Sequence, residues 1–171
     1  MRPNGEAAVI RTLLVADLPG VVGIQAASYP LSLREGRDAL ASRITLPSSY
    51  CLAATWGGVL QGYLLAHGWT SESPPAFGSV LASEGIGSEV LYIHDLAVAA
   101  SGGGVRLGRE LVARAVASSR SQGLRRAELI AVDGAVGYWL KAGFTKSPAP
   151  PNVARKLPSY GPRSSWMAME L

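Results

Sequence analysis

The transition from an apolar run through clustered glycines into an amphipathic run constrains this sequence more than any other feature. Residues 92–98 (YIHDLAV) predict a buried strand, residues 101–108 (SGGGVRLG) follow after two alanines, and residues 107–122 show helical apolar spacing. Amides in a glycine turn approach a ligand without interference from Cβ atoms, and a helix N-terminus carries about half a positive charge. Such a junction binds phosphate or pyrophosphate, although glycines also occur in such turns for steric reasons alone.

The elements before this junction can be predicted from periodicity and turn chemistry. Asp17 can cap a first helix, and Ser32 with Glu35 forms a capping-box pattern for a second. Gly57 and Gly58 separate two β-prone runs and predict a hairpin. The expected elements are a strand at 8–13, helices at 17–27 and 32–44, strands at 50–56 and 59–67, and a long loop at 68–88.

The elements after the junction alternate between strand and helix. Gly123 is a natural stop for the helix that begins at the glycines. The expected elements are then a strand at 127–132, a short helix at 134–141, a strand from residue 144, a proline-rich loop at 148–162 and a closing strand at 166–171.

Two motifs give this order a family resemblance. Residues 92–108, together with residues 138–144 (YWLKAGF) downstream, resemble the GNAT superfamily of acyl-CoA-dependent N-acetyltransferases, and the central motif is similar to that of the arylalkylamine N-acetyltransferases. The resemblance implies an α/β (α+β) fold with a splayed central mixed sheet flanked by helices. It also implies acetyl-CoA as co-substrate and no metal.

Length and composition bound the remaining possibilities. The 171 residues suit a single N-acetyltransferase domain over residues 1–171, and 48% hydrophobic with 16% charged residues excludes a largely disordered chain. A net charge of +4 suits an anionic co-substrate but is too small to indicate nucleic-acid binding. The lone Cys51 predicts a packed thiol, and the sequence has no signal-peptide pattern and no apolar run of membrane-spanning length. We therefore expect a cytoplasmic protein without nucleic-acid or membrane partners; a homodimer is left open.

The resemblance assigns the CoA site to the junction. It places the pantetheine arm along the main chain of Leu96, Ala97 and Val98, with the Leu96 amide bonded to the thioester carbonyl. The family signature has Arg or Gln where this chain has Gly103, and glycine where it has Arg106. The amides and charges expected at the pyrophosphate belong to Gly103, Gly104, Val105, Arg106, Leu107, Gly108 and Arg109.

The resemblance also suggests a base. Tyr92 and His94 should share one face of their strand, and the arylalkylamine enzymes have histidines at both positions. A base is needed because an alkylammonium, with a pKa near ~10, has no lone pair until it loses a proton, and histidine titrates near neutrality. A structural, hydrogen-bonded histidine is the alternative. Asp95 should face the opposite side unless a bulge, which the resemblance implies for this strand, redirects it. We expect Asp95 to be a buried carboxylate bonded to loop amides, with substrate binding as the alternative. His67 is expected at the surface end of its strand, with a place in the acceptor pocket as the alternative.

The acid that protonates the departing thiolate is the least defined residue. Trp139 occupies the position at which many relatives carry a tyrosine, so Tyr138 beside it and Tyr160 in the later loop are the candidates. The alternative for each is ordinary packing.

The predicted function is acetylation of a small primary amine by direct attack in a ternary complex. The alternatives are a protein or peptide N-acetyltransferase, a non-catalytic acyl-CoA-binding module, and a dinucleotide-binding regulator, against which the predicted antiparallel hairpin argues.

Overall fold

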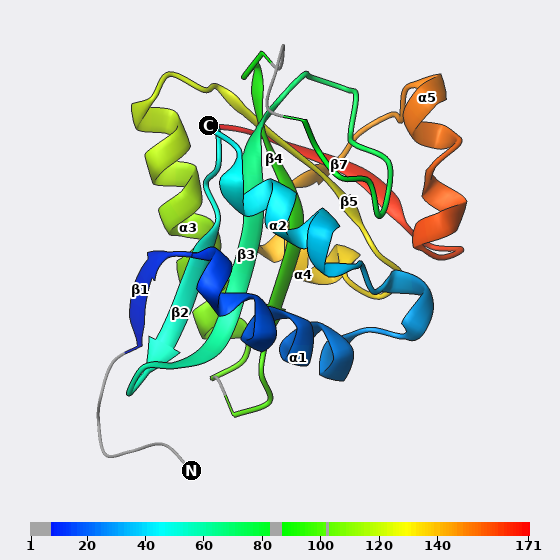
Figure 1. Cartoon of the computed structure of the whole chain (residues 1–171). Coiled ribbons are helices and arrows are strands. Elements are labelled where there is room, and N and C mark those ends of the chain that lie inside the picture. The colour runs from blue at the N-terminus through cyan, green and yellow to red at the C-terminus, as the bar shows by residue number, and fades with distance from the viewer. Residues whose placement is uncertain (1–7, 83–86, 102) are drawn as a thin grey trace.

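The computed structural model describes residues 8–82, 87–101 and 103–171. In these ranges one mixed sheet runs in the order β1-β2-β3-β4-β5-β7-β6 (Figure 1). Its strands are β1 (Val9–Thr12), β2 (Leu52–Trp56), β3 (Val59–Trp69), β4 (Val90–Val98), β5 (Arg126–Ala131), β6 (Thr145–Lys146) and β7 (Ser165–Glu170). The helices are α1 (Leu18–Ser28), α2 (Arg37–Thr45), α3 (Val105–Ser121), α4 (Val136–Lys141) and α5 (Pro151–Ala154), with 3₁₀ turns η1 (Val15–Asp17), η2 (Leu31–Leu33) and η3 (Leu157–Tyr160). The predicted mixed sheet and order of elements are confirmed.

The hairpin between β2 and β3 follows from its two turn residues. Gly57 and Gly58 both adopt positive φ, 53° and 79°, which a two-residue primed turn requires. Val59 then pairs with Trp56, and the two strands run antiparallel. The hairpin therefore has the turn that the sequence predicts.

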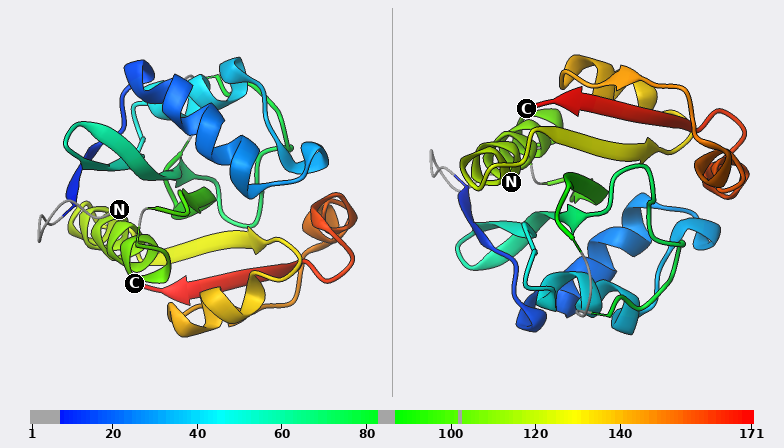
Figure 2. Two further views of the ribbon diagram at one scale, coloured as in Figure 1. Left: turned by 90° about the horizontal axis from the view of Figure 1, so that it is seen from below. Right: turned by 90° about the horizontal axis from the view of Figure 1, so that it is seen from above.

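The helices cover the two faces of the sheet. Residues from α1 and α2, including Val21 and Leu40, pack on Tyr63 and Leu65 of β3. On the other face, residues from α3 and α4 join a second core built on β3, β4 and β5. Figure 2 shows α1 and α2 on one side of the β3–β4 region and α3 on the other. None of the helices in the described ranges combines the length and apolar character needed to cross a membrane.

The central strands β4 and β5 separate soon after they meet. They are parallel, and they pair only at Leu91 with Ala127 and Tyr92 with Glu128. From Ile93 onward, the edge of β4 that faces β5 pairs with no strand of the described ranges. Ala99 donates its amide to Gln61 on the β3 side, so alternation directs the main-chain groups of Val98 and Leu96 toward the separated side.

A bulge in β4 changes the direction of its side chains. Ile93 pairs with Ala66 and Asp95 with Leu65, which leaves His94 as an extra residue. The bulge places His94 and the following Asp95 on the same face of the sheet, toward α1 and α2. The expected bulge is confirmed, and it redirects Asp95.

Three predictions about helices and loops are wrong. Asp17 directly precedes α1 but makes no side-chain cap hydrogen bond, because its carboxylate pairs with Arg11 and accepts from the Leu14 amide. Ser32 and Glu35 form no capping box, because α2 begins at Arg37 after Gly36 and has no side-chain cap. Glu35 is instead turned into the interior. Residues 148–162 are not only loop, because they contain α5 and η3. Gly102 of the predicted glycine turn and residues 83–86 of the predicted long loop lie outside the described residues.

Candidate active site

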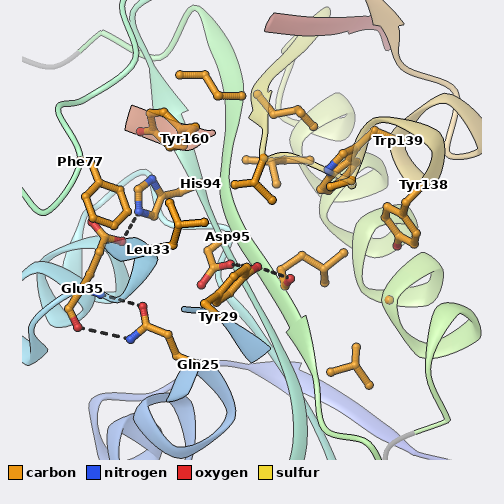
Figure 3. A pocket seen from close by; sticks show the side chains of 18 of the residues that line it. Gln25, Tyr29, Leu33, Glu35, Phe77, His94, Asp95, Tyr138, Trp139 and Tyr160 are labelled. Atoms are coloured by element: carbon orange, nitrogen blue, oxygen red, sulfur yellow. Dashed lines mark hydrogen bonds and ion pairs between the residues drawn. The ribbon is translucent and has the colours of Figure 1, made fainter. Parts of the chain in front are cut away.

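A pocket opens where β4 and β5 separate. Its volume is about 270 Å³, and Figure 3 shows the side chains that point into it. It lies between the β4 bulge, the start of α3, the start of α4 and the loops that follow α1 and precede β7. Its walls include the predicted residues His94, Leu96, Val98, Gly104, Val105, Gly108, Tyr138 and Tyr160.

His94 meets a carboxylate that the sequence did not assign to the site. Its Nε2 contacts Oε2 of Glu35, and the side chains of both residues are almost fully buried. The other ring nitrogen, Nδ1, is also buried and has no hydrogen-bond partner among the described residues. Figure 3 shows the ring between Glu35 and Tyr160.

Glu35 is fixed by contacts from several elements. Gln25 of α1 holds its main chain, accepting from the Glu35 amide at 2.8 Å and donating to its carbonyl at 3.3 Å. The Gly78 amide donates to Oε1 at 2.7 Å, and Nη2 of the fully buried Arg43 lies 3.4 Å from the same oxygen. Burial opposes ionisation of Glu35, but the hydrogen bond with His94 and the charges of His94 and Arg43 outweigh it and lower the pKa of Glu35.

Asp95 holds two tyrosines below the pocket. Tyr29, directly after α1, donates to Oδ1 at 2.6 Å, and Tyr63 of β3 donates to Oδ2 at 2.6 Å. The Tyr29 hydroxyl also lies 3.0 Å from the Leu96 carbonyl, within reach of the β4 main chain. Burial raises the pKa of Asp95 and outweighs the two tyrosine hydrogen bonds, which lower it. This agrees with the preferred structural reading of Asp95, with tyrosine hydroxyls in place of the expected loop amides.

Tyr138 and Tyr160 approach the pocket from different sides. The hydroxyl of each is buried and has no hydrogen-bond partner within the described ranges. Tyr138 extends from α4 to the first turns of α3, where its oxygen would be 2.8 Å from a Cβ on Gly108. Tyr160 packs edge-on against Phe77, and burial raises its pKa to about 12. Trp139 also lines the pocket, and it packs against Phe144 in the core.

The glycine junction leaves open space at the start of α3. Gly104 precedes the helix with φ of 60°, and a Cβ built there meets no atom within 4 Å. Arg106 is 84% exposed and pairs with Glu110 at 3.1 Å. Arg109 lines a neighbouring groove between α3 and α4, together with Lys141. The junction therefore offers amides and flanking cations, with Arg106 solvated.

Several predicted residues lie outside the pocket walls. Tyr92 is buried beside His94, with ring centroids 6.3 Å apart, so the expected shared face is confirmed. Ala97 packs in the core under α1, and Leu107 packs against the sheet from α3. Gly103, Arg106 and Arg109 border the junction without lining the pocket.

The expectation for His67 is wrong. β3 continues to Trp69, so His67 lies inside the strand with no exposed surface. It packs between Trp69 and Tyr92, with ring centroids 5.1 Å and 5.8 Å away. Burial, with the nearby charges of His94 and Arg43, lowers its pKa to about 3. No cluster of potential metal ligands occurs within the described ranges.

The pocket, the separated strands and the glycine junction agree with a comparison to known families. The model of the acetyltransferase (GNAT) family matches residues 18–144, which is more than half of the chain. The chain belongs to the GNAT family. No curated protein sequence matches it.

Solved structures share this GNAT fold at low sequence identity. Rv2747 from Mycobacterium tuberculosis, solved with CoA, is 17% identical with a TM-score of 0.70, over 95% of this chain and 99% of that one. The ribosomal-protein-S18-alanine N-acetyltransferase from Escherichia coli is 15% identical with a TM-score of 0.68, over 96% and 94%. The GphF GNAT-like decarboxylase, solved with isobutyryl-CoA, is 15% identical with a TM-score of 0.76, over 95% and 98%. The family implies an acyltransferase that uses acyl-CoA.

The sequence analysis of this GNAT domain missed Glu35, Gln25, Tyr29 and Phe77. Glu35 is 59 positions from His94 and fits a capping pattern, so no local signal pairs the two. One local hint was available, because Gly36 is itself an acceptable N-cap residue and frees Glu35 for another role.

Proposed function

We propose that this chain is an acetyl-CoA-dependent N-acetyltransferase that acetylates the primary amine of a small molecule by direct attack in a ternary complex. The observation that carries the proposal is the buried Nδ1 of His94, which has no hydrogen-bond partner among the described residues. His94 lines the pocket where β4 separates from β5 and leads to the glycine junction. The proposed base, His94, and the proposed binding path for acyl-CoA along β4 therefore lie in the same pocket.

The junction fits the anionic end of acetyl-CoA. Amides of residues 103–108 and the α3 N-terminus would hold the pyrophosphate, and the open space at Gly104 lets it approach the main chain. Main-chain groups of Leu96 and Val98 on the unpaired β4 edge would bind the pantetheine arm. The Leu96 amide would also donate to the thioester carbonyl, and such a donor typically contributes about 3–4 kcal/mol to transition-state stabilisation.

The pocket residues then move two protons. Nδ1 of His94 accepts the proton of the ammonium, which frees the nitrogen lone pair to attack the thioester carbonyl. The carbon–sulfur bond breaks, and a tyrosine hydroxyl protonates the departing thiolate. We favour Tyr160 over Tyr138 because Tyr160 packs against Phe77 in the lining of the pocket that holds His94, whereas the Tyr138 hydroxyl reaches from α4 toward Gly108 of α3.

The walls favour a small acceptor with an apolar body. Leu33, Phe77 and Tyr29 line the side of the pocket on which His94 and Glu35 lie. A protein or peptide acceptor is the alternative, and the name of the E. coli neighbour shows that this fold also serves a protein acceptor. The single-domain organisation and cytoplasmic location remain predictions.

A non-catalytic acyl-CoA-binding module is a second candidate. It is favoured by two departures from the family pattern, Gly103 in place of Arg or Gln and Trp139 in place of tyrosine.

One experiment separates these functions. Acetyl-CoA is incubated with arylalkylamines, polyamines, amino acids and short peptides, and CoA release is measured together with thermal stability. Release with a small amine supports the proposal, and release with peptides alone supports the alternative acceptor. Thermal stabilisation by acetyl-CoA without any release supports the binding module.

A further inference from the structure

The two nitrogens of the buried His94 ring have different environments. Nε2 faces the Glu35 carboxylate, whereas Nδ1 has no hydrogen-bond partner among the described residues. A neutral imidazole carries one proton, and only the nitrogen without it can act as a base. The position of that proton therefore decides whether His94 can serve the acceptor amine.

We propose that Glu35 is a positioning residue that fixes the proton of His94 on Nε2 and so presents an unprotonated Nδ1 to the acceptor. The inference rests on the proposed function for its catalytic consequence. The placement of the proton itself can be measured without turnover.

Charge decides the direction of the Glu35–His94 hydrogen bond. Oε1 of Glu35 accepts from the Gly78 amide at 2.7 Å and lies 3.4 Å from the buried Arg43 cation, and both contacts favour the ionised carboxylate whatever the charge of His94. The lowered pKa of Glu35 agrees with this geometry. An ionised carboxylate only accepts hydrogen bonds, and Nε2 must then be the donor. Arg43, which is fully buried, compensates the negative charge from the opposite oxygen at 3.4 Å.

Glu35 is also held in one orientation. Gln25 bonds both its amide and its carbonyl, and Gly78 donates to Oε1. Arg43 in turn donates to the carbonyls of Ala39 at 2.7 Å and Ser79 at 3.1 Å. The carboxylate is therefore anchored to α1, α2 and the loop after β3, and each of these anchors lies outside β4.

This arrangement makes Glu35→Gln an unusually specific test. Oε1 faces two donors, the Gly78 amide and the Arg43 guanidinium, so the amide oxygen of a glutamine should occupy that position. Its NH₂ group then faces Nε2 of His94. Because NH₂ can only donate, Nε2 must become the acceptor and the ring proton must move to Nδ1. The variant should hold His94 in the wrong tautomer with little change in shape.

The readouts are ring-nitrogen NMR and pH-dependent kinetics. Long-range ¹H–¹⁵N spectra report which nitrogen carries the proton, and His67→Gln assigns the signals because the chain has only two histidines. Glu35→Gln should move the proton to Nδ1 and lower kcat by at least about tenfold, up to the ~10⁴-fold cost of a mis-oriented catalytic imidazole, with the KM for acetyl-CoA unchanged. The ascending limb of kcat/KM should also move to lower pH, because an amide cannot stabilise an imidazolium.

Glu128→Gln is the matched control. Glu128 is also a buried carboxylate, and it accepts from Ser71, from the Glu72 amide and from Arg126, outside the pocket walls. The Glu128→Gln substitution should lower the free energy of unfolding while leaving the His94 tautomer and the pH profile of kcat/KM unchanged.

Three results would overturn the inference. One is a wild-type spectrum at about pH 7.5 with the His94 proton on Nδ1, which decides the matter even if Glu35→Gln does not fold. The second is a folded Glu35→Gln variant in which His94 keeps the wild-type tautomer. The third is a folded Glu35→Gln variant whose kcat stays within about twofold of the wild-type value. A wild type that acetylates no amine would refute the proposed function alone, because the spectrum would still test the proton position.

Discussion

Replacement of His67 by glutamine should remove a pH-dependent part of the free energy of unfolding. His67 is fully buried inside β3, and its environment includes the rings of Trp69 and Tyr92 and the charges of His94 and Arg43. Burial, followed by those charges, lowers its pKa from 6.5 to about 3. Glutamine keeps a polar side chain there but does not titrate.

The sign and size follow from proton linkage. Between about pH 3 and 6.5 the unfolded chain binds a proton at His67 that the folded chain excludes, so stability falls as pH falls. The neutral ring's contribution is fully present above pH 6.5. From about pH 7.5 to about pH 5, these two pKa values give a loss of about 2 kcal/mol. A folded pKa one unit higher changes this figure little, because at pH 5 the buried ring would still be mostly neutral.

Urea unfolding of wild type and His67→Gln at several pH values measures this contribution. All other ionisable groups are present in both proteins, so their effects largely cancel when the pH-dependent changes in the free energy of unfolding are subtracted. Between about pH 7.5 and pH 5, the free energy of unfolding of the wild type should fall by about 2 kcal/mol more than that of the variant. A difference below about 0.5 kcal/mol would show that His67 is protonated in the folded protein and would refute the reasoning.

Three further predictions concern the proposed reaction. Gly104→Pro should weaken CoA binding, measured calorimetrically, by more than about tenfold, because proline cannot adopt φ of 60° and lacks an amide. Gly123→Ala, strained at φ of 94° beyond the opposite end of α3, should leave CoA binding unchanged. His94→Gln should lower kcat by about 100- to 10,000-fold, and wild-type turnover from about pH 6 to 9 would exclude it as the base. Tyr160→Phe should lower turnover more than Tyr138→Phe, with acetyl-CoA affinity retained in both; if neither loses more than about twofold, solvent protonates the thiolate.

Local signals in the sequence predicted most of the fold. The hairpin depends on Gly57 and Gly58, whose positive φ is a property of two adjacent residues. α3 ends where Gly123 adopts φ of 94°, as its position after the apolar period predicts. Such signals depend on residues close together in the sequence, so they can be recognised without the tertiary structure.

The same local signals failed where a residue's role depends on distant neighbours. Glu35 fits a capping box, but its side chain is buried beside His94 and Arg43, and Gly36 takes the N-cap position. His67 was expected at the end of a strand, but β3 extends two residues further along β4, to Trp69 opposite Val90.

The sequence by itself determined the order of elements, the β4 motif and the glycine junction, because hydrophobic periodicity and turn chemistry depend on residues that are near one another in the sequence. Only the tertiary structure decided what surrounds the reactive group. The β4 bulge turns Asp95 toward Tyr29, 66 positions away, and the packing of α1 and α2 brings Glu35 to His94 across 59 positions. Those contacts arise from burial and charge compensation between separate elements, and such contacts leave no pattern in the residues that flank them.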